Sequence, residues 1–500
     1  MSYQLHGFVE EQAKRTIRKY QLLIYRRKRD LKKREKRTGK KIKTPIKTTI
    51  PRWGLEQQFN PFYVRAKSAS LSHAIEARIK AKSYKPRPSL DVRIAKDGGG
   101  GRKISIYSVP DAAVGTWLHR RLQTRNSFLL SESAFGYRPD KNANDAIRHI
   151  ADAVGGAPRL FVVEYDFEKF FDSIDHSYLI GVLNKHFQIR ADEMTVLQAL
   201  LSGQSAFETE YKNKAFTQRK MGIPQGNTIS LFLANAVCHE LDKGLEGLGV
   251  TFARYADDIV VVAQSYFKAG RAADRILRWS ARSKVKINYK KSDGVSLLTS
   301  RGVGEIKSKR SIVFLGCEIS SSGVRPAEKR IDRIKTKIAR VVYQHLIQAP
   351  KKRTFSKKRI QPDVDWDLVT CVNEIRKIIY GRLSETDLTN GLNSKDPRKS
   401  IRSHMSGFAM VDSPNRFREL DGWLVGLLER AYSMRASLVS KSVKPLKLTR
   451  KLIISGDWYK FKEFTQESRL PSSFRAWLYI HMMYRLRGMR ALPAPLYGYE

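Results

Sequence analysis

The stretch FARYADDIVVVA (residues 252–263) decides the fold, because it places two adjacent aspartates between two apolar runs. Its β-branched and aromatic residues predict a pair of buried strands, with Asp257 and Asp258 at the tight turn that joins them. A second run, RLFVVEYD (159–166), predicts another buried strand that ends at Asp166. If these strands are neighbours, the three carboxylates converge at one rim of a sheet.

A cluster of three carboxylates predicts a magnesium site. Mg²⁺ prefers hard oxygen ligands and substrate phosphates to nitrogen or sulfur. Two such ions, or Mn²⁺ in their place, can activate an attacking 3′-oxygen and stabilise a departing pyrophosphate. The alternative is an ordinary polar turn, because aspartates are common in turns and a Tyr-x-Asp-Asp string alone is weakly specific.

The remaining sequence predicts an α+β body followed by a helical one. Further strands are expected at 91–96 and 102–109, as a hairpin around the glycine run 98–101, and at 312–320. Helical stretches lie between them, which favours a sheet with packed helices. Beyond residue 325 the strand signals fade and amphipathic helices follow.

The charge of the chain predicts a polyanionic partner. The 500 residues contain 94 Lys and Arg against 48 Asp and Glu, a formal charge of +46. Self-repulsion of this size favours binding to nucleic acid, with an anionic membrane surface as the weaker alternative. A run of about 18 apolar residues and a secretory signal are both missing, so we expect a cytoplasmic protein without a membrane partner. Three widely separated cysteines argue against a disulfide framework or a zinc site.

The first basic segment, residues 11–50, has 17 Lys and Arg against three acidic residues. Its apolar residues recur at helical spacing, and the helix is expected to end near Thr38-Gly39. The apolar positions are Ala13, Ile17, Tyr20, Ile24 and Leu31. A solvated basic arm is the alternative to a helix that grips RNA. The candidate RNA-binding residues are Arg26, Arg27, Lys28, Arg29, Lys32 and Lys33.

The second basic segment, residues 325–360, has 13 Lys and Arg against two acidic residues. It predicts an amphipathic helix that buries Ile331, Ile334, Ile338 and Val341. The candidate RNA-binding residues beside this face are Arg333, Lys337 and Arg340.

Seven blocks in order along the chain resemble the reverse transcriptase family in its bacterial form. They are RIAKDGGGGRKISIYSVPDAAV (93–114), SAFGYRPDKNANDAI (133–147), FVVEYDFEKFFDSIDHSYL (161–179), MGIPQGNTISLFLANAVCHELD (221–242), FARYADDIVVVA (252–263), INYKKS (287–292) and FLGCEI (314–319). The resemblance implies a right-hand polymerase. Its expected parts are a basic N-terminal helix and linker (1–55), fingers and palm (56–320), a helical thumb (321–390) and a helical C-terminal region (391–500).

The resemblance also implies site residues. Asp166, Asp257 and Asp258 would be the catalytic metal ligands, together with the backbone carbonyl of Phe167. Phe171 falls where the family has an aromatic steric gate that would exclude a ribose 2′-hydroxyl. Core packing is the alternative for this ring.

Four further contacts would bind the nucleotide. Lys96 and Arg102 flank the glycine hairpin and would neutralise charge on the triphosphate, unless they are only a solvated hairpin face. Gln225 and Gly226 match the segment against the nascent base pair, where glycine permits close backbone approach. Lys291 corresponds to a basic residue near the nucleotide.

The layout is most similar to defence-associated (anti-phage) reverse transcriptases, because blocks typical of other branches are missing. The expected partners are an RNA template, in particular a structured noncoding RNA, the DNA product and deoxynucleoside triphosphates. Assembly into a homo-oligomer is an open alternative. The alternatives are a group II intron-type reverse transcriptase or maturase, an RNA-templated RNA polymerase, and a catalytically idle RNA-binding protein. Tyr497 and Tyr499 could prime synthesis through a hydroxyl, with interface packing as the alternative.

Overall fold

The computed structural model describes residues 4–42, 48–95, 101–299, 306–459 and 469–492. The chain divides into two compact units. The first unit comprises Met1–Arg27, Pro45–Pro139 and Phe161–Ser296, and the second comprises Lys28–Thr44, Asp140–Leu160 and Leu297–Glu500.

The predicted basic helix is α1 (Leu5–Thr38), and it ends where the sequence predicts. Its buried residues Leu5, Val9, Ala13 and Ile17 follow the helical period and all lie in the first unit. Val9 and Ala13 pack with Val64 and Val109 in one apolar cluster. The first half of α1 is therefore a packed helix of the first unit, and the solvated arm is excluded for this half.

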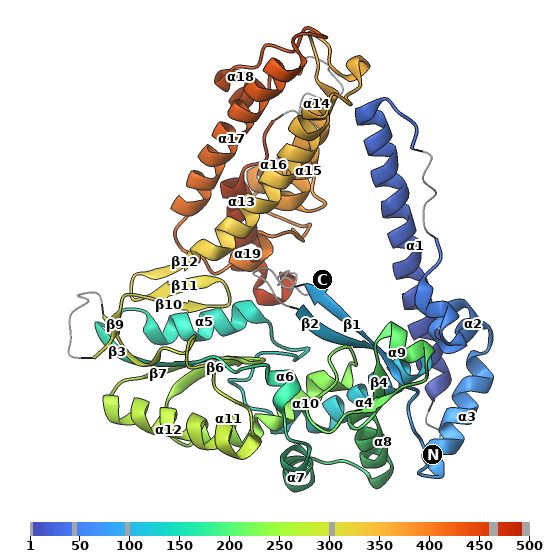
Figure 1. The fold of residues 1–500 in the computed structure, drawn as a ribbon. Coiled ribbons are helices and arrows are strands. Elements are labelled where there is room, and N and C mark those ends of the chain that lie inside the picture. The colour runs from blue at the N-terminus through green and yellow to red at the C-terminus, as the bar shows by residue number, and fades with distance from the viewer. Residues whose placement is uncertain (1–3, 43–47, 96–100, 300–305, 460–468, 493–500) are drawn as a thin grey trace. The chain divides into compact units, whose positions relative to one another are not determined.

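The first unit combines two sheets with helices (Figure 1). Its helices, besides the first part of α1, are η1 (Pro51–Gly54), η2 (Gln57–Phe59), α2 (Pro61–Ala66), α3 (Ser68–Lys80), α4 (Val109–Asn126), η3 (Ser127–Leu129), α6 (Phe170–Ser173), α7 (His176–His186), α8 (Ala191–Leu201), α9 (Glu208–Lys212), α10 (Ile229–Val237), α11 (His239–Glu246) and α12 (Tyr266–Ser283). Its strands are β1 (Ser89–Ala95), β2 (Gly101–Ile106), β3 (Arg159–Tyr165), β4 (Gln204–Ala206), β5 (Thr217–Gln218), β6 (Thr251–Tyr255), β7 (Asp258–Ala263) and the start of β8 (Gly294–Thr299).

The sheet that positions the aspartates has the order β6-β7-β3, with β8 next to β3. Strands β3 and β7 are antiparallel, with Phe161 opposite Ala263 and Tyr165 opposite Ile259. The middle of β7 is buried on both faces, which explains the uninterrupted apolar run in the sequence. Helix α12 packs against β7, and α11 packs against α12 (Figure 1). The predicted strand pair at the Asp-Asp turn is confirmed.

The second sheet of this unit has the order β2-β1-β4-β5. Strands β1 and β2 form the predicted antiparallel hairpin, with Leu90 opposite Ile106 and Ala95 opposite Gly101. Residues 96–100, which include Lys96 and most of the glycine run, lie outside the described residues.

The second unit is mainly helical (Figure 1). Besides the last part of α1, its elements are α5 (Ala143–Val154), β9 (Ser308–Lys309), β10 (Ile312–Phe314), β11 (Cys317–Ser320), β12 (Gly323–Pro326), α13 (Glu328–Val342), the π-helix η4 (Tyr343–Ile347), α14 (Gln348–Lys351), η5 (Lys357–Arg359), α15 (Trp366–Tyr380), α16 (Glu385–Asn393), η6 (Ser406–Phe408), α17 (Asn415–Val439), α18 (Arg450–Ser455), α19 (Ser473–Arg487) and η8 (Met489–Ala491). Helix α13 packs against both α15 and α17. The α+β class with a helical C-terminal part is therefore confirmed. Across the described part of the chain, none of the helices is both long and apolar enough to span a membrane.

Two predictions for this unit are corrected. The single strand expected at 312–320 is a hairpin of β10 and β11, because Leu315 and Gly316 both adopt positive φ, +49° and +77°, and reverse the chain. On α13 the fourth buried position is Val342, since Val341 is only half-buried. The helix therefore buries positions 331, 334, 338 and 342, which follow its 3.6-residue period.

The three cysteines are all free thiols inside the protein. Burial raises the pKa of Cys238 to about 12 and that of Cys317 to about 11, and it raises the pKa of Cys371 as well.

Candidate active site

The three aspartates lie at one edge of the β6-β7-β3 sheet. Tyr165 of β3 pairs with Ile259 of β7, so the next positions outward, Asp166 and Asp258, follow the same register. The β6–β7 hairpin closes with Tyr255 opposite Asp258, which leaves Ala256 and Asp257 as a two-residue turn. The convergence expected from the sequence is therefore confirmed by strand pairing.

The three carboxylates are close enough to interact electrostatically. Desolvation by the surrounding protein raises the pKa of Asp258 to about 7, although the residue keeps exposed surface at the start of β7, and the charges of Asp257 and Asp166 act in the same direction. Lys291 supplies a nearby cation, with its Nζ 4.0 Å from Asp166 Oδ2. Mutually repelling carboxylates at an accessible sheet edge are the donor set that a hard divalent cation would neutralise.

This donor set fits a cation that is shared with a substrate. Among the described residues, no group of three or more His, Cys, Asp or Glu side chains is arranged to hold a metal ion by itself. Mg²⁺ in nucleotide-transferring sites commonly takes one or two carboxylates, and substrate phosphates and water complete its shell. The aspartates therefore fit Mg²⁺ as partial ligands.

Residues 286–292 hold Asp166 through the main chain. The amide of Asn288 donates to the carbonyl of Asp166 at 2.7 Å, and the amide of Asp166 donates to Ser292 Oγ at 3.0 Å. Phe167 forms a bridge with Ile287, and its buried ring packs on Trp279. The structure thus brings Lys291 to the aspartates, and it adds Ser292, which the sequence did not suggest.

The Gln225-Gly226 loop lies against β2. The amide of Ser105 donates to the carbonyl of Gln225 at 2.7 Å, while the Gln225 side chain donates to Asp172 Oδ1 at 3.2 Å. Ser105 Oγ donates to Asp91 Oδ1 at 2.7 Å and accepts from Arg219 Nη2 at 3.1 Å. Sequence reasoning missed Ser105, Asp91 and Arg219, because the Ser105–Asp91 contact depends on the register of the β1–β2 hairpin and the Ser105–Arg219 contact joins residues 114 positions apart.

Phe171 lies on the short helix α6 with only 9% of its surface exposed. Its ring makes edge contacts with Tyr137, at a centroid distance of 6.2 Å, and with Phe170, at 5.5 Å. The amide of Ile223 donates to the carbonyl of Phe171 at 2.7 Å, so this aromatic position adjoins the segment before Gln225. The steric-gate role stays a prediction.

Arg102 lies in β2 opposite Ile94, with a half-buried side chain. Its role at the triphosphate also stays a prediction.

Arg254 makes a buried contact next to the aspartate turn. Its Nε and Nη2 donate to the two carboxylate oxygens of Asp242 at 2.7 and 2.6 Å. Its Nη1 donates at 3.2 Å both to Asn235 Oδ1 and to the carbonyl oxygen of Ala256. Sequence reasoning missed this arginine, although a single cation inside an apolar strand is a detectable signal, because buried charges are rare unless paired.

Gly136 approaches the same turn from another segment. A Cβ on Gly136 would lie 2.4 Å from the amide nitrogen of Ala256, so only glycine fits. The segment before it pairs with β6, since Phe135 donates to the carbonyl of Arg254 at 2.8 Å and Arg254 donates to that of Ser133 at 2.9 Å. Asn235 Nδ2 donates to the carbonyl of Gly136 at 3.0 Å, which ties this segment to α10.

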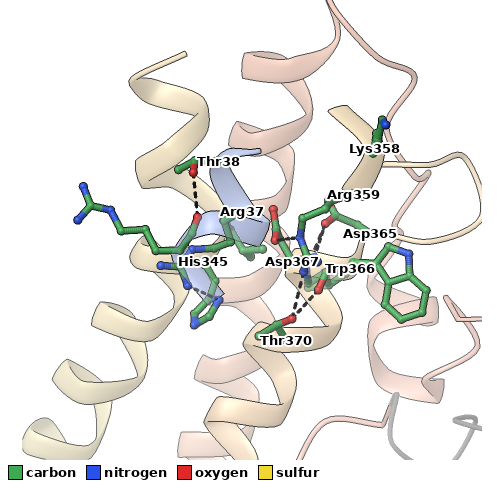
Figure 2. A network of polar contacts seen from close by, with 12 residues as sticks. Arg37, Thr38, His345, Lys358, Arg359, Asp365, Trp366, Asp367 and Thr370 are labelled. Carbon is green, nitrogen blue, oxygen red and sulfur yellow. Dashed lines mark hydrogen bonds and ion pairs between the residues drawn. The ribbon is translucent and has the colours of Figure 1, made fainter. Parts of the chain in front are cut away.

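In the second unit, the helices are joined by a buried polar network (Figure 2). Arg359 Nε donates to Asp367 Oδ1 at 2.7 Å. The fully buried Arg435 donates to Asp365 Oδ2 at 2.7 Å and to Asp367 Oδ2 at 2.9 Å. It also donates to the carbonyl of Leu346 at 3.0 Å, at the π-helix where regular helical bonding is interrupted. This network anchors the second basic segment.

The end of α1 contacts the same group of helices. Lys33 forms an ion pair with Glu374, and the Arg37 guanidinium lies 3.3 Å from His345 Nδ1 (Figure 2). Burial and the charge of Arg37 lower the pKa of His345 to about 3, so this imidazole is neutral at pH 7. Lys33 is therefore engaged within the protein, whereas Arg26, Lys28 and Lys32 are exposed.

Three other candidate RNA-binding residues share the polar side of α13. Arg333, Lys337 and Arg340 are exposed, opposite the buried face of the helix. The Lys337 ammonium lies 3.0 Å from His404 Nε2. The amphipathic helix is confirmed, and RNA binding stays a prediction for these residues.

Comparison with known proteins finds a family match for the part of the chain that holds the aspartates. Residues 94–319 match the family described as "Reverse transcriptase (RNA-dependent DNA polymerase)". This match runs from the end of β1 into β11 and includes all three aspartates. Residues 94–319, a little less than half of the chain, are therefore similar to a reverse transcriptase domain.

Individual relatives cover parts of the chain. The group II intron-encoded protein LtrA of Lactococcus lactis subsp. cremoris is 27% identical over 42% of this chain and 34% of its own length. The retron Ec86 reverse transcriptase of Escherichia coli is 29% identical over 40% of this chain and 56% of its own length. A solved telomerase from Candida albicans, in complex with a TWJ fragment of telomeric RNA, has a TM-score of 0.40 and 11% identity over 80% of this chain and 68% of its own. The chain thus spans about a third to a half of the length of these two curated relatives.

Proposed function

We propose that this protein is an RNA-directed DNA polymerase. The observation that carries the proposal is the pairing of β3 with the β6–β7 hairpin, which sets Asp166 beside Asp257 and Asp258 inside the region similar to a reverse transcriptase domain. Carboxylates that repel each other at close range destabilise a fold, so a protein that keeps them together gains from them in function.

Asp166, Asp257 and Asp258, with the backbone carbonyl of Phe167, would hold two Mg²⁺ ions, or Mn²⁺ as the alternative. When bound, such ions lower the pKa of an attacking 3′-hydroxyl and stabilise the charge on a departing pyrophosphate. Lys291, whose Nζ lies beside the carboxylate of Asp166, would bind a phosphate of the incoming nucleotide. Gln225 and Gly226, held against β2 by Ser105, would support the nascent base pair.

Primer extension on an RNA template tests this proposal. The double variant Asp257→Asn, Asp258→Asn should keep its melting temperature and RNA affinity and lose incorporation of deoxynucleotides by at least about 1,000-fold. Asp274→Asn is the matched control, because Asp274 is an exposed acid of α12 that pairs only with Arg278 among the described contacts. Undiminished synthesis by the double variant would overturn the assignment.

The choice of sugar depends on Phe171. Removing the ring in Phe171→Ala should raise ribonucleotide incorporation relative to deoxynucleotide incorporation if this position is the gate. An unchanged ratio would assign the ring to core packing. Wild-type protein that prefers ribonucleotides would favour the alternative, an RNA-templated RNA polymerase.

We propose further that a structured noncoding RNA is bound as template or scaffold and that the enzyme acts in anti-phage defence. The basic residues exposed on α1 and α13 support the RNA part, because their charge would follow a phosphate backbone. RNA that copurifies at moderate salt should be enriched in one transcript, and sequencing would identify template and product together. The defence part predicts that cells with the intact gene plate phage less efficiently than cells with the Asp257→Asn, Asp258→Asn variant.

A group II intron-type enzyme is the second candidate, favoured by the similarity to LtrA. In that case, the copurifying RNA should be the intron that surrounds the gene. A third outcome, enriched RNA without synthesis by the wild-type protein, would assign the chain to the idle RNA-binding alternative. Priming by Tyr497 or Tyr499 concerns residues outside the described part, and covalently attached product would support it.

A further inference from the structure

The turn between β6 and β7 is held in an unusual backbone conformation. Ala256 has a φ of +60°, a region that non-glycine residues rarely occupy. Such a conformation persists only where the surroundings fix it, and strained positions of this kind cluster at functional sites. Because Asp257 follows directly, the angle of this turn sets the direction of its carboxylate.

Two contacts fix the turn from different segments. Arg254 Nη1 donates to the carbonyl oxygen of Ala256 at 3.2 Å. The backbone of Gly136 lies so close to the amide nitrogen of Ala256 that a Cβ would be only 2.4 Å from it. The peptide units on both sides of the Ala256 Cα are therefore held.

The guanidinium itself has little freedom. Its side chain is fully buried, and a bidentate pair with Asp242 uses Nε and Nη2, which leaves Nη1 directed at Ala256 and Asn235. A buried ion pair adds little net stability, because desolvation offsets most of the attraction. The planar fork of arginine does, however, fix the direction of its remaining donor.

We infer that Arg254 is a positioning residue for the proposed reaction: with Asp242 behind it and Gly136 opposite, it sets the Ala256-Asp257 turn and therefore the direction of the catalytic carboxylates. This inference rests on the proposed function. It concerns the rate of the chemical step, because Arg254 is buried away from solvent.

The first test removes both partners of the Arg254–Asp242 ion pair. Arg254→Met combined with Asp242→Leu leaves no unpaired charge, so the melting temperature should stay within about 5 °C of wild type. The kcat for nucleotide addition should fall about 100-fold, the cost of a displacement of about 1 Å, with the KM for the nucleotide within about threefold. The single variant Arg254→Lys keeps the positive charge, so its kcat should lie between that of the double variant and that of wild type. A folded double variant with wild-type kcat would overturn the inference.

The second test moves the turn and keeps every charge. Gly136→Ala should push against the Ala256 amide and lower kcat about 10-fold or more. Gly181→Ala is the matched control, since a Cβ there has no neighbour within 4 Å. Glu193→Gln controls for the loss of a buried ionic contact elsewhere in the first unit, and it should lower the melting temperature without lowering kcat. A Gly136→Ala variant with unchanged kcat would overturn the inference even where the double variant does not fold.

These outcomes are separable from failure of the proposed function. If the wild-type protein has no synthesis to lose, the proposed function fails. If Asp257→Asn, Asp258→Asn abolishes synthesis while the Arg254 and Gly136 variants retain it, only the positioning role fails.

Discussion

The carbonyl oxygen of Ser105 lies 2.2 Å from the place where a Cβ on Gly226 would be, and Gly226 has a φ of +124°. Sequence reasoning expected a close approach at this glycine, but toward a bound base pair. The structure adds a second reason for glycine, because the loop must also pass against strand β2. The Gln225-Gly226 segment and the β1–β2 hairpin are thus in direct contact.

Gly226→Ala should impair nucleotide use more than folding. The added methyl group must displace either the loop or β2, and both carry residues proposed to contact the nucleotide. We expect kcat/KM for the deoxynucleotide to fall about 100-fold in steady-state primer extension. Gly270→Ala in α12 is the control, because a Cβ there meets nothing within 4 Å. Equal kcat/KM values for the two variants would contradict the close-approach argument.

Lys291→Met should weaken nucleotide binding and leave stability unchanged. The side chain is 70% exposed and lies 4.0 Å from Asp166 Oδ2, where it could bind a phosphate. Loss of a charge-assisted contact of about 1.5 to 3 kcal/mol should raise the nucleotide KM about 10- to 100-fold. Lys290→Met removes the neighbouring exposed lysine and should leave KM within about twofold. A larger effect at Lys290 would assign the phosphate contact to that residue.

Glu193 should contribute stability that depends on pH. Burial opposes its ionisation, but hydrogen bonds from Arg125 and Arg121 outweigh this and lower its pKa to about 2, against 4.5 for an ordinary glutamate. Because this pKa is lower in the folded than in the unfolded state, the ionised carboxylate stabilises the folded protein fully above pH 4.5. The contribution is lost as the pH falls toward 2.

Glu193→Gln should therefore lower the free energy of unfolding by about 2 kcal/mol at pH 7. The difference from wild type should shrink between pH 4.5 and 2. Urea unfolding of both proteins across this range measures it. A difference that is independent of pH would show that packing, and not charge, makes the contribution.

The exposed basic residues of α1 should bind RNA, whereas Lys33 should contribute to the stability of the fold. Replacing the exposed Arg26, Lys28 and Lys32 by Gln should make the plot of log K for RNA binding against log salt less steep by about 2 to 3, because each phosphate contact contributes about 0.9. Lys33→Gln should change this slope less and lower the melting temperature, since Lys33 pairs with the partly buried Glu374. Equal slopes for the triple variant and wild type would exclude these residues from the RNA interface.

The fold elements that the sequence predicted correctly are those with strong local signals. The helix ending at Thr38 and the strands around Asp257 depend on periodicity and apolar runs within a few residues. The hairpin at Leu315-Gly316 was missed because Leu315 adopts a backbone conformation that its residue type does not suggest. A positive φ at leucine depends on its tertiary surroundings, which a local pattern does not contain.

At the candidate site, the sequence predicted the residues with chemistry and missed those that support them. Asp166, Asp257 and Lys291 were expected and do lie together. Asp242 and Ser105 were not expected, because their partners come from other elements and their residue types are ordinary in any surface segment. The packing of α11 near β6 brings Asp242 to Arg254, and the pairing of β1 with β2 brings Ser105 to Asp91.

The burial of every native thiol makes the wild-type chain a ready background for site-directed labelling. Cys238, Cys317 and Cys371 have no exposed surface and raised pKa values, so the folded protein should react slowly with maleimides. A cysteine introduced at an exposed position, such as Lys28 or Met434, would carry a spin label or fluorophore without prior removal of native cysteines. Both of these positions belong to the second unit, so the distance between probes there would report on that unit alone.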